Sequence, residues 1–199
     1  MDKAKAMKDF FDRVAEGWDE GNQERSGVRE SLIKSLPIKT GDRVLDVGCG
    51  TGVITGVLHS MSKEKVTAID ISPKMIEIAK SKEQPLVNEY ICGDFTACDF
   101  KHSYDAAVMF NCYPHFMDRE ALKTALTNSL KKDSYFAIVH NNGRGELFAC
   151  HKRHMDYSRN ILSPEDEAVF YNDYFELIKA EEGPDYYYLL LRLRGAECR

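Results

Sequence analysis

The sequence has little of what a membrane-spanning or nucleic-acid-binding protein needs. No apolar run approaches the roughly 20 residues that cross a bilayer, and the longest, Tyr186 to Leu191, has the length of a strand. The net charge is −5, and Lys and Arg form no block that would bind a phosphate backbone. We therefore expect neither a membrane nor a nucleic acid as a partner.

The six cysteines lack the spacing of a disulfide framework or a metal site. They are scattered among 199 residues with no CxxC pair, and the opening MDKAKAMKDFFDRV has no apolar signal-peptide core. We expect free thiols in a reducing cytoplasm. The length and the 43% hydrophobic content suit one domain over residues 1–199, as a monomer or a homodimer.

The first 36 residues have a helical pattern. Apolar side chains at helical spacing predict an amphipathic helix near the N-terminus: Met7, Phe10, Phe11, Val14 and Trp18. A second helix is predicted over residues 23–36, and it ends there because proline at position 37 pushes the preceding residue out of the helical region.

The periodicity then changes to an alternation of strands and helices. Short β-type runs (RVLDV, KVTAID, LVNEYICGD, YDAAVMF, YFAIVH) alternate with amphipathic segments (TGVITGVLHSM, SPKMIEIAKSK, DREALKTALTNSLKK). This rhythm predicts a doubly wound α/β sheet with parallel strands. A further helix is expected over residues 164–171, and two β-type runs around EEGPD predict a C-terminal antiparallel hairpin over residues 175–194.

The stretch VLDVGCGTG, residues 44–52, lies between the first predicted strand and its helix. Glycines 48, 50 and 52 let the backbone turn tightly and approach a ligand. The loop amides lie near a helix N-terminus, which favours an anionic group. Twenty residues after Gly50, Asp70 ends VTAID, where it can accept hydrogen bonds from a ribose diol. A cofactor of the nucleotide type fits these features.

The glycine spacing separates two cofactor classes. A dinucleotide fingerprint beginning at Gly48 or Gly50 needs glycine at position 53 or 55, and these positions hold Val53 and Thr55. Asp46 is also unusual in a dinucleotide loop, whereas a carboxylate there can hold the cationic amino-acid end of S-adenosylmethionine (SAM). The spacing disfavours NAD without removing it.

At these residues the sequence resembles the class I SAM-dependent methyltransferases of the small-molecule type, and the resemblance covers most of the chain. It implies a Rossmann-like sheet of seven mostly parallel strands with an antiparallel C-terminal hairpin and an N-terminal helical lid. It also implies a SAM site in which Asp70 holds the ribose, Ile71 and Met75 pack on the adenine, and Asp94 takes the adenine amino group. The full set of implied SAM-binding residues is Asp46, Gly48, Cys49, Gly50, Gly52, Asp70, Ile71, Met75, Asp94, Phe95 and Asn111.

Histidines and aromatic residues after the fourth and fifth strands suggest the acceptor side. His115 in FNCYPHF and His140 at the end of YFAIVH are the expected catalytic residues, because ligands bind above the carboxyl ends of parallel strands. The expected acceptor contacts are Phe11, Trp18, Tyr113, His115 and His151, with residues 141–163 as a substrate-side insertion. Cys112 is expected only to line the pocket, because methyl transfer from SAM needs no covalent enzyme intermediate.

The expected function is methyl transfer from SAM to a small molecule by in-line displacement. Two alternatives keep the cofactor: a SAM-binding sensor without turnover, and a metal-assisted methyltransferase that uses His115, His140, His151 and His154. A nicotinamide-dependent oxidoreductase is a third. The acceptor, the methylated atom and the oligomeric state stay open.

Overall fold

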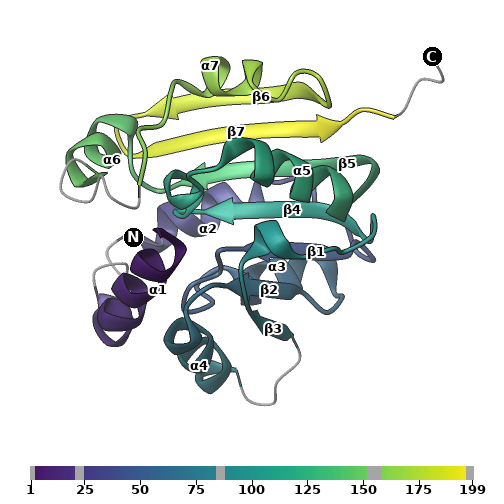
Figure 1. Cartoon of the computed structure of the whole chain (residues 1–199). Coiled ribbons are helices and arrows are strands. Elements are labelled where there is room, and N and C mark those ends of the chain that lie inside the picture. Colours follow the sequence, from purple (N-terminus) through teal and green to yellow (C-terminus); the bar gives the residue numbers. More distant parts are fainter. Residues whose placement is uncertain (1–2, 21–24, 84–87, 152–157, 196–199) are drawn as a thin grey trace.

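One mixed sheet organises the computed structural model, which describes residues 3–20, 25–83, 88–151 and 158–195 (Figure 1). Its strand order is β3-β2-β1-β4-β5-β7-β6. The strands are β1 Val44–Val47, β2 Thr67–Asp70, β3 Glu89–Cys92, β4 Tyr104–Phe110, β5 Leu130–His140, β6 Phe175–Gly183 and β7 Tyr186–Leu193. β1 to β5 pair in parallel, and β7 runs antiparallel to both β5 and β6. The predicted seven-stranded sheet with a C-terminal hairpin is confirmed.

Helices connect the strands and cover both faces of the sheet. They are α1 Lys3–Val14, α2 Ser26–Lys34, α3 Thr55–Ser62, α4 Pro73–Lys82, α5 Arg119–Ser129, α6 Arg144–His151 and α7 Pro164–Val169. Short 3₁₀ turns are η1 Ala15–Gly17, η3 Phe95–Ala97 and η4 Tyr113–His115. α4 and α7 both begin at a Ser-Pro pair whose serine is the N-cap: the Ser72 side chain accepts from the Met75 amide and that of Ser163 from the Asp166 amide.

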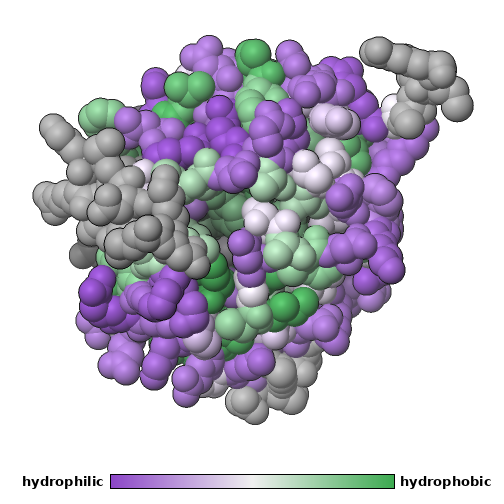
Figure 2. Space-filling view, in the orientation of Figure 1, coloured by the Kyte–Doolittle hydropathy of each residue, from purple (hydrophilic) through white to green (hydrophobic). Residues whose placement is uncertain are grey.

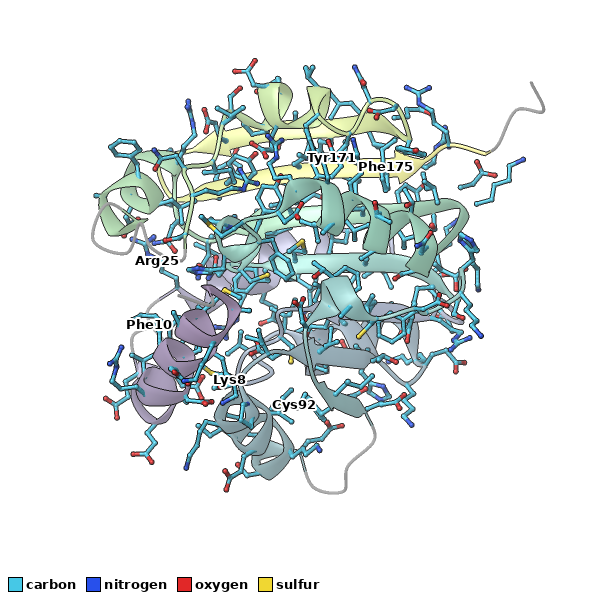
Figure 3. The ribbon with its side chains drawn as sticks, in the orientation of Figure 1. Lys8, Phe10, Arg25, Cys92, Tyr171 and Phe175 are labelled. Carbon is cyan, nitrogen blue, oxygen red and sulfur yellow. The ribbon has the colours of Figure 1, made fainter. Side chains whose placement is uncertain are left out.

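Side chains alternate between two buried layers, because successive residues of a strand point to opposite faces. On one face, Val44, Val108 and Val139 pack with Ile33 of α2 and Leu58 of α3. The opposite layer joins the other strand positions to α5 and to the α7 region: Leu45, Met109, Ile138, Leu122, Leu126, Ala168, Tyr171 and Phe175. Tyr171 and Phe175 meet edge to face at 5.9 Å beneath β6 and β7 (Figure 3).

Several predicted helix boundaries are wrong, and the helix predicted to end at residue 36 ends at Lys34 as α2. Residues 51–54 form turns, and α3 begins only at Thr55, because Gly52 has a φ of +77°, outside the helical region. α5 ends at Ser129, since the fully buried Leu130 already pairs with Tyr104 as the first residue of β5. The helix predicted over residues 164–171 ends at Val169 as α7. For α3 a positive φ, and for α5 a strand pairing, overrides the local helical pattern.

The surface agrees with the composition. Hydrophobic side chains gather in the middle of the face drawn in Figure 2, with hydrophilic ones above and below them. Within the described ranges, no helix is both long enough and apolar enough to span a membrane. The thiols of Cys49, Cys92, Cys98 and Cys112 are free, as expected.

Candidate active site

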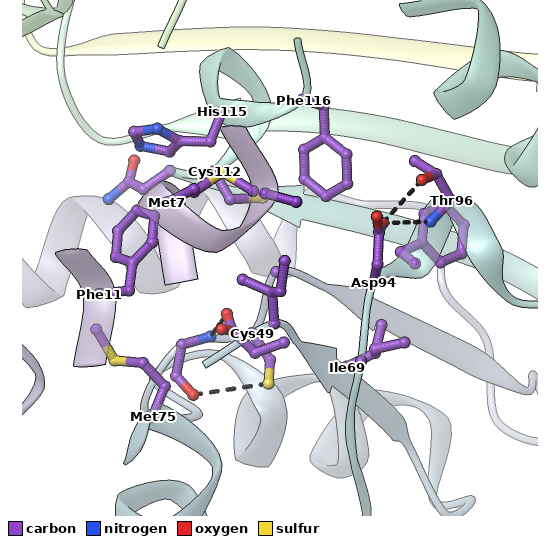
Figure 4. Close-up of a pocket in the computed structure, with 18 of the residues that line it drawn as sticks. Met7, Phe11, Cys49, Ile69, Met75, Asp94, Thr96, Cys112, His115 and Phe116 are labelled. Atoms are coloured by element: carbon purple, nitrogen blue, oxygen red, sulfur yellow. Dashed lines mark hydrogen bonds between the residues drawn. The ribbon is translucent and has the colours of Figure 1, made fainter. Parts of the chain in front are cut away.

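A pocket opens above the carboxyl ends of β1, β2 and β4, beneath α1 (Figure 4). Five segments build its walls, which include the glycine loop, the ends of β2 and β4, the turn after β3 and the N-terminal lid (residues 3–20). The lining residues are Ala4, Met7, Phe11, Trp18, Gly48, Cys49, Gly50, Val53, Ile69, Asp70, Ile71, Met75, Gly93, Asp94, Phe95, Thr96, Phe110, Asn111, Cys112, His115, Phe116, Met117 and Asp118.

Backbone hydrogen bonds hold the glycine loop against the end of β2. The amides of Gly48 and Cys49 both donate to the carbonyl of Ile69, at 2.8 and 3.1 Å. Gly48 has a φ of +67°, and a Cβ there would lie 2.7 Å from the Cys112 sulfur. Position 48 therefore needs glycine both for its conformation and for the close approach of the η4 segment.

Asp70 is the central carboxylate of the pocket. Its Oδ2 accepts from the Gly50 amide at 2.9 Å and its Oδ1 from the Ser72 amide at 2.8 Å. Burial raises the pKa of Asp70, and these two amides oppose the shift. Because a carboxylate offers about four lone-pair sites, Asp70 can hold the glycine loop and still accept from a bound diol.

Asp46 and Gly52 lie behind the loop and do not line the pocket. Asp46 is 1% exposed and points toward α3, where the Thr55 hydroxyl donates to its Oδ2 at 2.7 Å. Burial raises the pKa of Asp46 to about 7; the Thr55 hydrogen bond opposes this shift and the Asp70 charge adds to it. Its buried Oδ1 has no hydrogen-bond partner among the described residues, and the pocket lining does not include Asp46, which was predicted to contact SAM.

The four residues predicted to surround the adenine are brought together in the pocket wall. Ile71, Met75, Asp94 and Phe95 all line the pocket, and Phe95 and Met75 are almost fully buried. Asp94 Oδ1 caps η3 by accepting from the amide and the hydroxyl of Thr96, at 2.9 and 2.8 Å. This cap fixes the direction of the Asp94 side chain at the pocket wall.

The end of β4 is locked to the end of β5. Asn111, at a φ of +54°, donates from Nδ2 to Asn141 Oδ1 at 2.7 Å and accepts from the Asn141 amide at 3.2 Å. The next residue, Cys112, donates its thiol to the Val47 carbonyl at 3.0 Å. Burial raises the pKa of the Cys112 thiol well above its usual value, which keeps it neutral and suits a residue of the pocket wall.

The N-terminal lid closes the pocket with aromatic rings, and two of its own carboxylates bind it to the rest of the protein. The Phe11 ring meets His115 and Trp18 edge to face, at 5.0 and 5.6 Å. Asp12 accepts from the Ser72 hydroxyl at 2.6 Å and from the Lys74 amide at 3.3 Å. Further along, Asp19 accepts from the Thr51 hydroxyl at 2.5 Å and pairs with Lys82. No sequence signal identified these two aspartates.

Two predicted acceptor-side residues, Tyr113 and His140, are not brought into the pocket. The Tyr113 ring is fully buried, and its hydroxyl donates to Glu167 and lies 3.0 Å from the Tyr171 hydroxyl. His140 is also fully buried and packs edge-on against Tyr187 at 5.8 Å. The backbone of His151 ends α6, and its side chain lies outside the described part of the structure, as does the whole of His154.

His115 is the pocket histidine of the described chain. Sequence reasoning missed several residues of the pocket wall: Met7, Thr96, Met117 and Asp118. The helical spacing of the N-terminal segment contained the signal for Met7, since Phe11 is one turn further along the same face. Among the described residues, no three or more His, Cys, Asp or Glu side chains are grouped so as to hold a metal ion.

Comparison with protein families gives one matching family model. Residues 44–133 match a methyltransferase domain. A malonyl-acyl-carrier-protein O-methyltransferase of Acetivibrio thermocellus is 30% identical over 137 residues, which are 67% of this chain and 48% of the relative. A demethylmenaquinone methyltransferase of Tropheryma whipplei is 34% identical over 114 residues, or 53% of this chain and 46% of the relative. The chain thus spans about half the length of these curated relatives.

Solved structures share the fold. A SAM-dependent methyltransferase from Aquifex aeolicus superposes with a TM-score of 0.66, covering 82% of this chain and 88% of that one at 20% identity. At this identity the likeness concerns the fold alone.

Proposed function

Because residues 44–133 are a methyltransferase domain and the chain has the class I SAM-dependent methyltransferase fold, we propose that this protein transfers the methyl group of SAM to a small-molecule acceptor. The match and the names of the relatives confirm the predicted family and its cofactor, SAM. The observation that carries the proposal is the position of Asp70, which holds the glycine loop while facing a pocket that also contains His115.

The residues present fit SAM. The positive φ and missing Cβ at Gly50 leave the loop backbone open to the ligand, and Asp70 is placed to accept from the ribose hydroxyls. Ile71 and Met75 give an apolar surface for the adenine, whereas Asp46 is buried behind the loop and does not line the pocket. SAM bound there supplies an electrophilic methyl group on a sulfonium, which an aligned nucleophile removes in one displacement.

The protein contributes alignment, exclusion of water and a proton acceptor. Orientation of the reactants can supply on the order of 7–11 kcal/mol in favourable cases. The lid covers the pocket with Phe11 and Trp18, and His115 stands beside Phe11 where an acceptor would lie. An imidazole there can take the proton of a nucleophile that arrives protonated, a contribution of roughly 10²–10⁴ in rate.

Replacing Asp70 by Ala tests the cofactor site directly. We expect the affinity for S-adenosylhomocysteine (SAH) to fall by roughly 1.5–3 kcal/mol, the usual loss for hydrogen bonds to a charged group, or by about 10- to 150-fold. Isothermal titration with SAH measures it. Glu77→Ala is the matched control, because Glu77 is an exposed carboxylate on α4. Equal affinity of the Asp70 variant and the control would show that the cofactor lies elsewhere.

Replacing Asp12 by Ala tests the lid. The variant loses the Ser72 and Lys74 contacts that bind α1 to α4, and we expect SAH to dissociate roughly 5–30 times faster, for a loss of about 1–2 kcal/mol. Trp18 is the only tryptophan of the chain, so stopped-flow fluorescence can follow release.

The matched control for the lid is Asp9→Ala. Asp9 also pairs with a lysine one turn away, Lys5, but its side chain is 55% exposed. If both variants released SAH at the wild-type rate, the contact between α1 and α4 would have no part in retaining the ligand.

A further inference from the structure

We infer that the acceptor of this site is a neutral, flat and largely apolar nucleophile, such as a phenol, thiol or amine on an aromatic ring, and that carboxylate and phosphate acceptors are excluded. The inference rests on the proposed function, because it concerns the part of the same pocket left for the acceptor. It is carried by the charge and shape of the pocket walls.

The formal charges of the pocket walls are negative. Asp70 and Asp94 line the part of the pocket proposed for SAM and Asp118 lines it beside Met117, whereas no Lys or Arg among the described residues lines the pocket. An anionic acceptor would therefore lose its hydration without gaining a cationic side chain as a partner, and it would face the Asp118 carboxylate of its own sign. A neutral acceptor avoids both costs.

Nearby cationic side chains already have acidic partners. Lys8 of α1 pairs with Asp12 at 2.7 Å, and Lys82 of α4 pairs with Asp19. Behind η4, Arg159 lies 3.0 Å from the buried Glu167. Moving Arg159 toward an acceptor would break a buried ion pair, which is costly, whereas Lys8 and Lys82 would lose partly exposed pairs that are worth less. None of these three side chains lines the pocket.

The acceptor end of the pocket is apolar and lined by rings. Phe11 and His115 meet edge to face at 5.0 Å, and Phe116 faces the cavity from the far side of Cys112 (Figure 4). Met7 and Met117 complete the wall with flexible thioethers, which adapt to aromatic ligands and pack favourably against ring edges. Flat rings fit between such walls better than branched or strongly hydrated groups.

The chemistry balances with the groups on hand. A lone pair of the acceptor forms a bond to the methyl carbon, the carbon–sulfur bond breaks, and its electron pair stays on sulfur to give SAH. The O–H, S–H or N–H proton of the acceptor passes to the His115 imidazole and then to solvent. No oxidant, reductant or metal is required.

A matched pair of ligands tests the inference by binding alone. We would titrate the full chain, saturated with SAH, with methyl 4-hydroxybenzoate and with 4-hydroxybenzoate, which carry the same phenol but differ by one negative charge. At pH 8, where an ordinary imidazole is neutral, we expect the ester to bind at least about tenfold more tightly than the acid. Equal or tighter binding of the acid, or binding of neither compound, would overturn the inference.

Variants at the pocket rim identify the cause of the preference. Met117 is 36% exposed and lines the pocket, so Met117→Lys adds a cation there without removing an ion pair, and Met117→Gln is its neutral control. We expect the lysine variant to bind the acid about tenfold more tightly than wild type does, and the glutamine variant to keep the wild-type ratio. An unchanged ratio in both variants would contradict selection by charge.

Different results would contradict the proposed function and the inference about the acceptor. Absence of SAH binding to the wild-type protein would end the proposed function. Normal SAH binding together with preference for the acid would end only the inference about the acceptor.

Discussion

Replacing Glu167 by Ala is expected to lower the free energy of unfolding by roughly 3–5 kcal/mol, the usual cost of removing one partner of a buried ion pair. Glu167 of α7 is fully buried, and it accepts from Arg159 at 3.0 Å, from the Leu162 amide at 3.2 Å and from the Tyr113 hydroxyl, while Arg119 pairs with it at 2.8 Å. Alanine would leave two guanidinium groups without their shared carboxylate.

Thermal denaturation followed by circular dichroism measures the loss. For a chain of this length, 3–5 kcal/mol corresponds to a fall in melting temperature of roughly 6–20 °C. Glu165→Ala is the control, because Glu165 is an exposed carboxylate in the first turn of the same helix, and its loss should cost only a few tenths of a kcal/mol. Equal melting temperatures for the two variants would show that the buried network contributes nothing to stability.

The network also explains how the η4 turn is held. The Arg159 amide donates to the Pro114 carbonyl at 2.9 Å, and its guanidinium lies over the Tyr113 ring at 4.4 Å. Tyr113 therefore serves as an anchor within the core, and the same turn presents His115 on its opposite side, toward the lid.

Replacing Asp46 by Asn is expected to change how stability depends on pH. Burial raises the pKa of Asp46 to about 7 from its ordinary value of 3.8, so between these pH values the folded protein holds a proton that the unfolded chain has lost. The contribution of Asp46 to stability is therefore present at low pH and is lost as pH rises toward 7. About three pKa units correspond to a loss of up to roughly 4 kcal/mol.

Asparagine has nearly the same shape and no charge, so the variant should lack this loss. Chemical denaturation of both proteins between pH 4 and pH 8 should show similar stabilities at pH 4 and a growing advantage for the variant up to about pH 7, followed by a constant difference. Asp99→Asn, at an exposed carboxylate, should follow the wild type throughout. A pH-independent difference between wild type and Asp46→Asn would contradict the raised pKa.

The cofactor half of the site could be predicted because its residues follow local rules. Gly48 needs a positive φ, and Asp70 ends the next parallel strand, so the order of a βαβ unit brings them together whatever the rest of the chain does. The doubly wound sheet and its hairpin follow from the same periodicities.

The acceptor half depended on side-chain direction and on contacts between distant segments. Tyr113 and His115 are two residues apart in η4, yet only the packing of Glu167, more than fifty residues later, decides that the first points into the core. His140 sits on the strand face that packs against Tyr187, and Asp46 on the face beneath α3. Strand alternation predicts that successive residues point to opposite faces of the sheet, but it does not say which of these residues reach the ligand pocket.

The sequence by itself therefore determined the fold, the glycine loop and the carboxylate at its end, since these rest on short-range geometry. Only the tertiary structure decided which histidine lines the pocket and that Asp12 and Asp19 anchor the lid to the rest of the protein. It also decided that the nearby cationic side chains are paired with acidic partners. Those features arise from contacts across many residues of chain, and their energy depends on burial that no local pattern encodes.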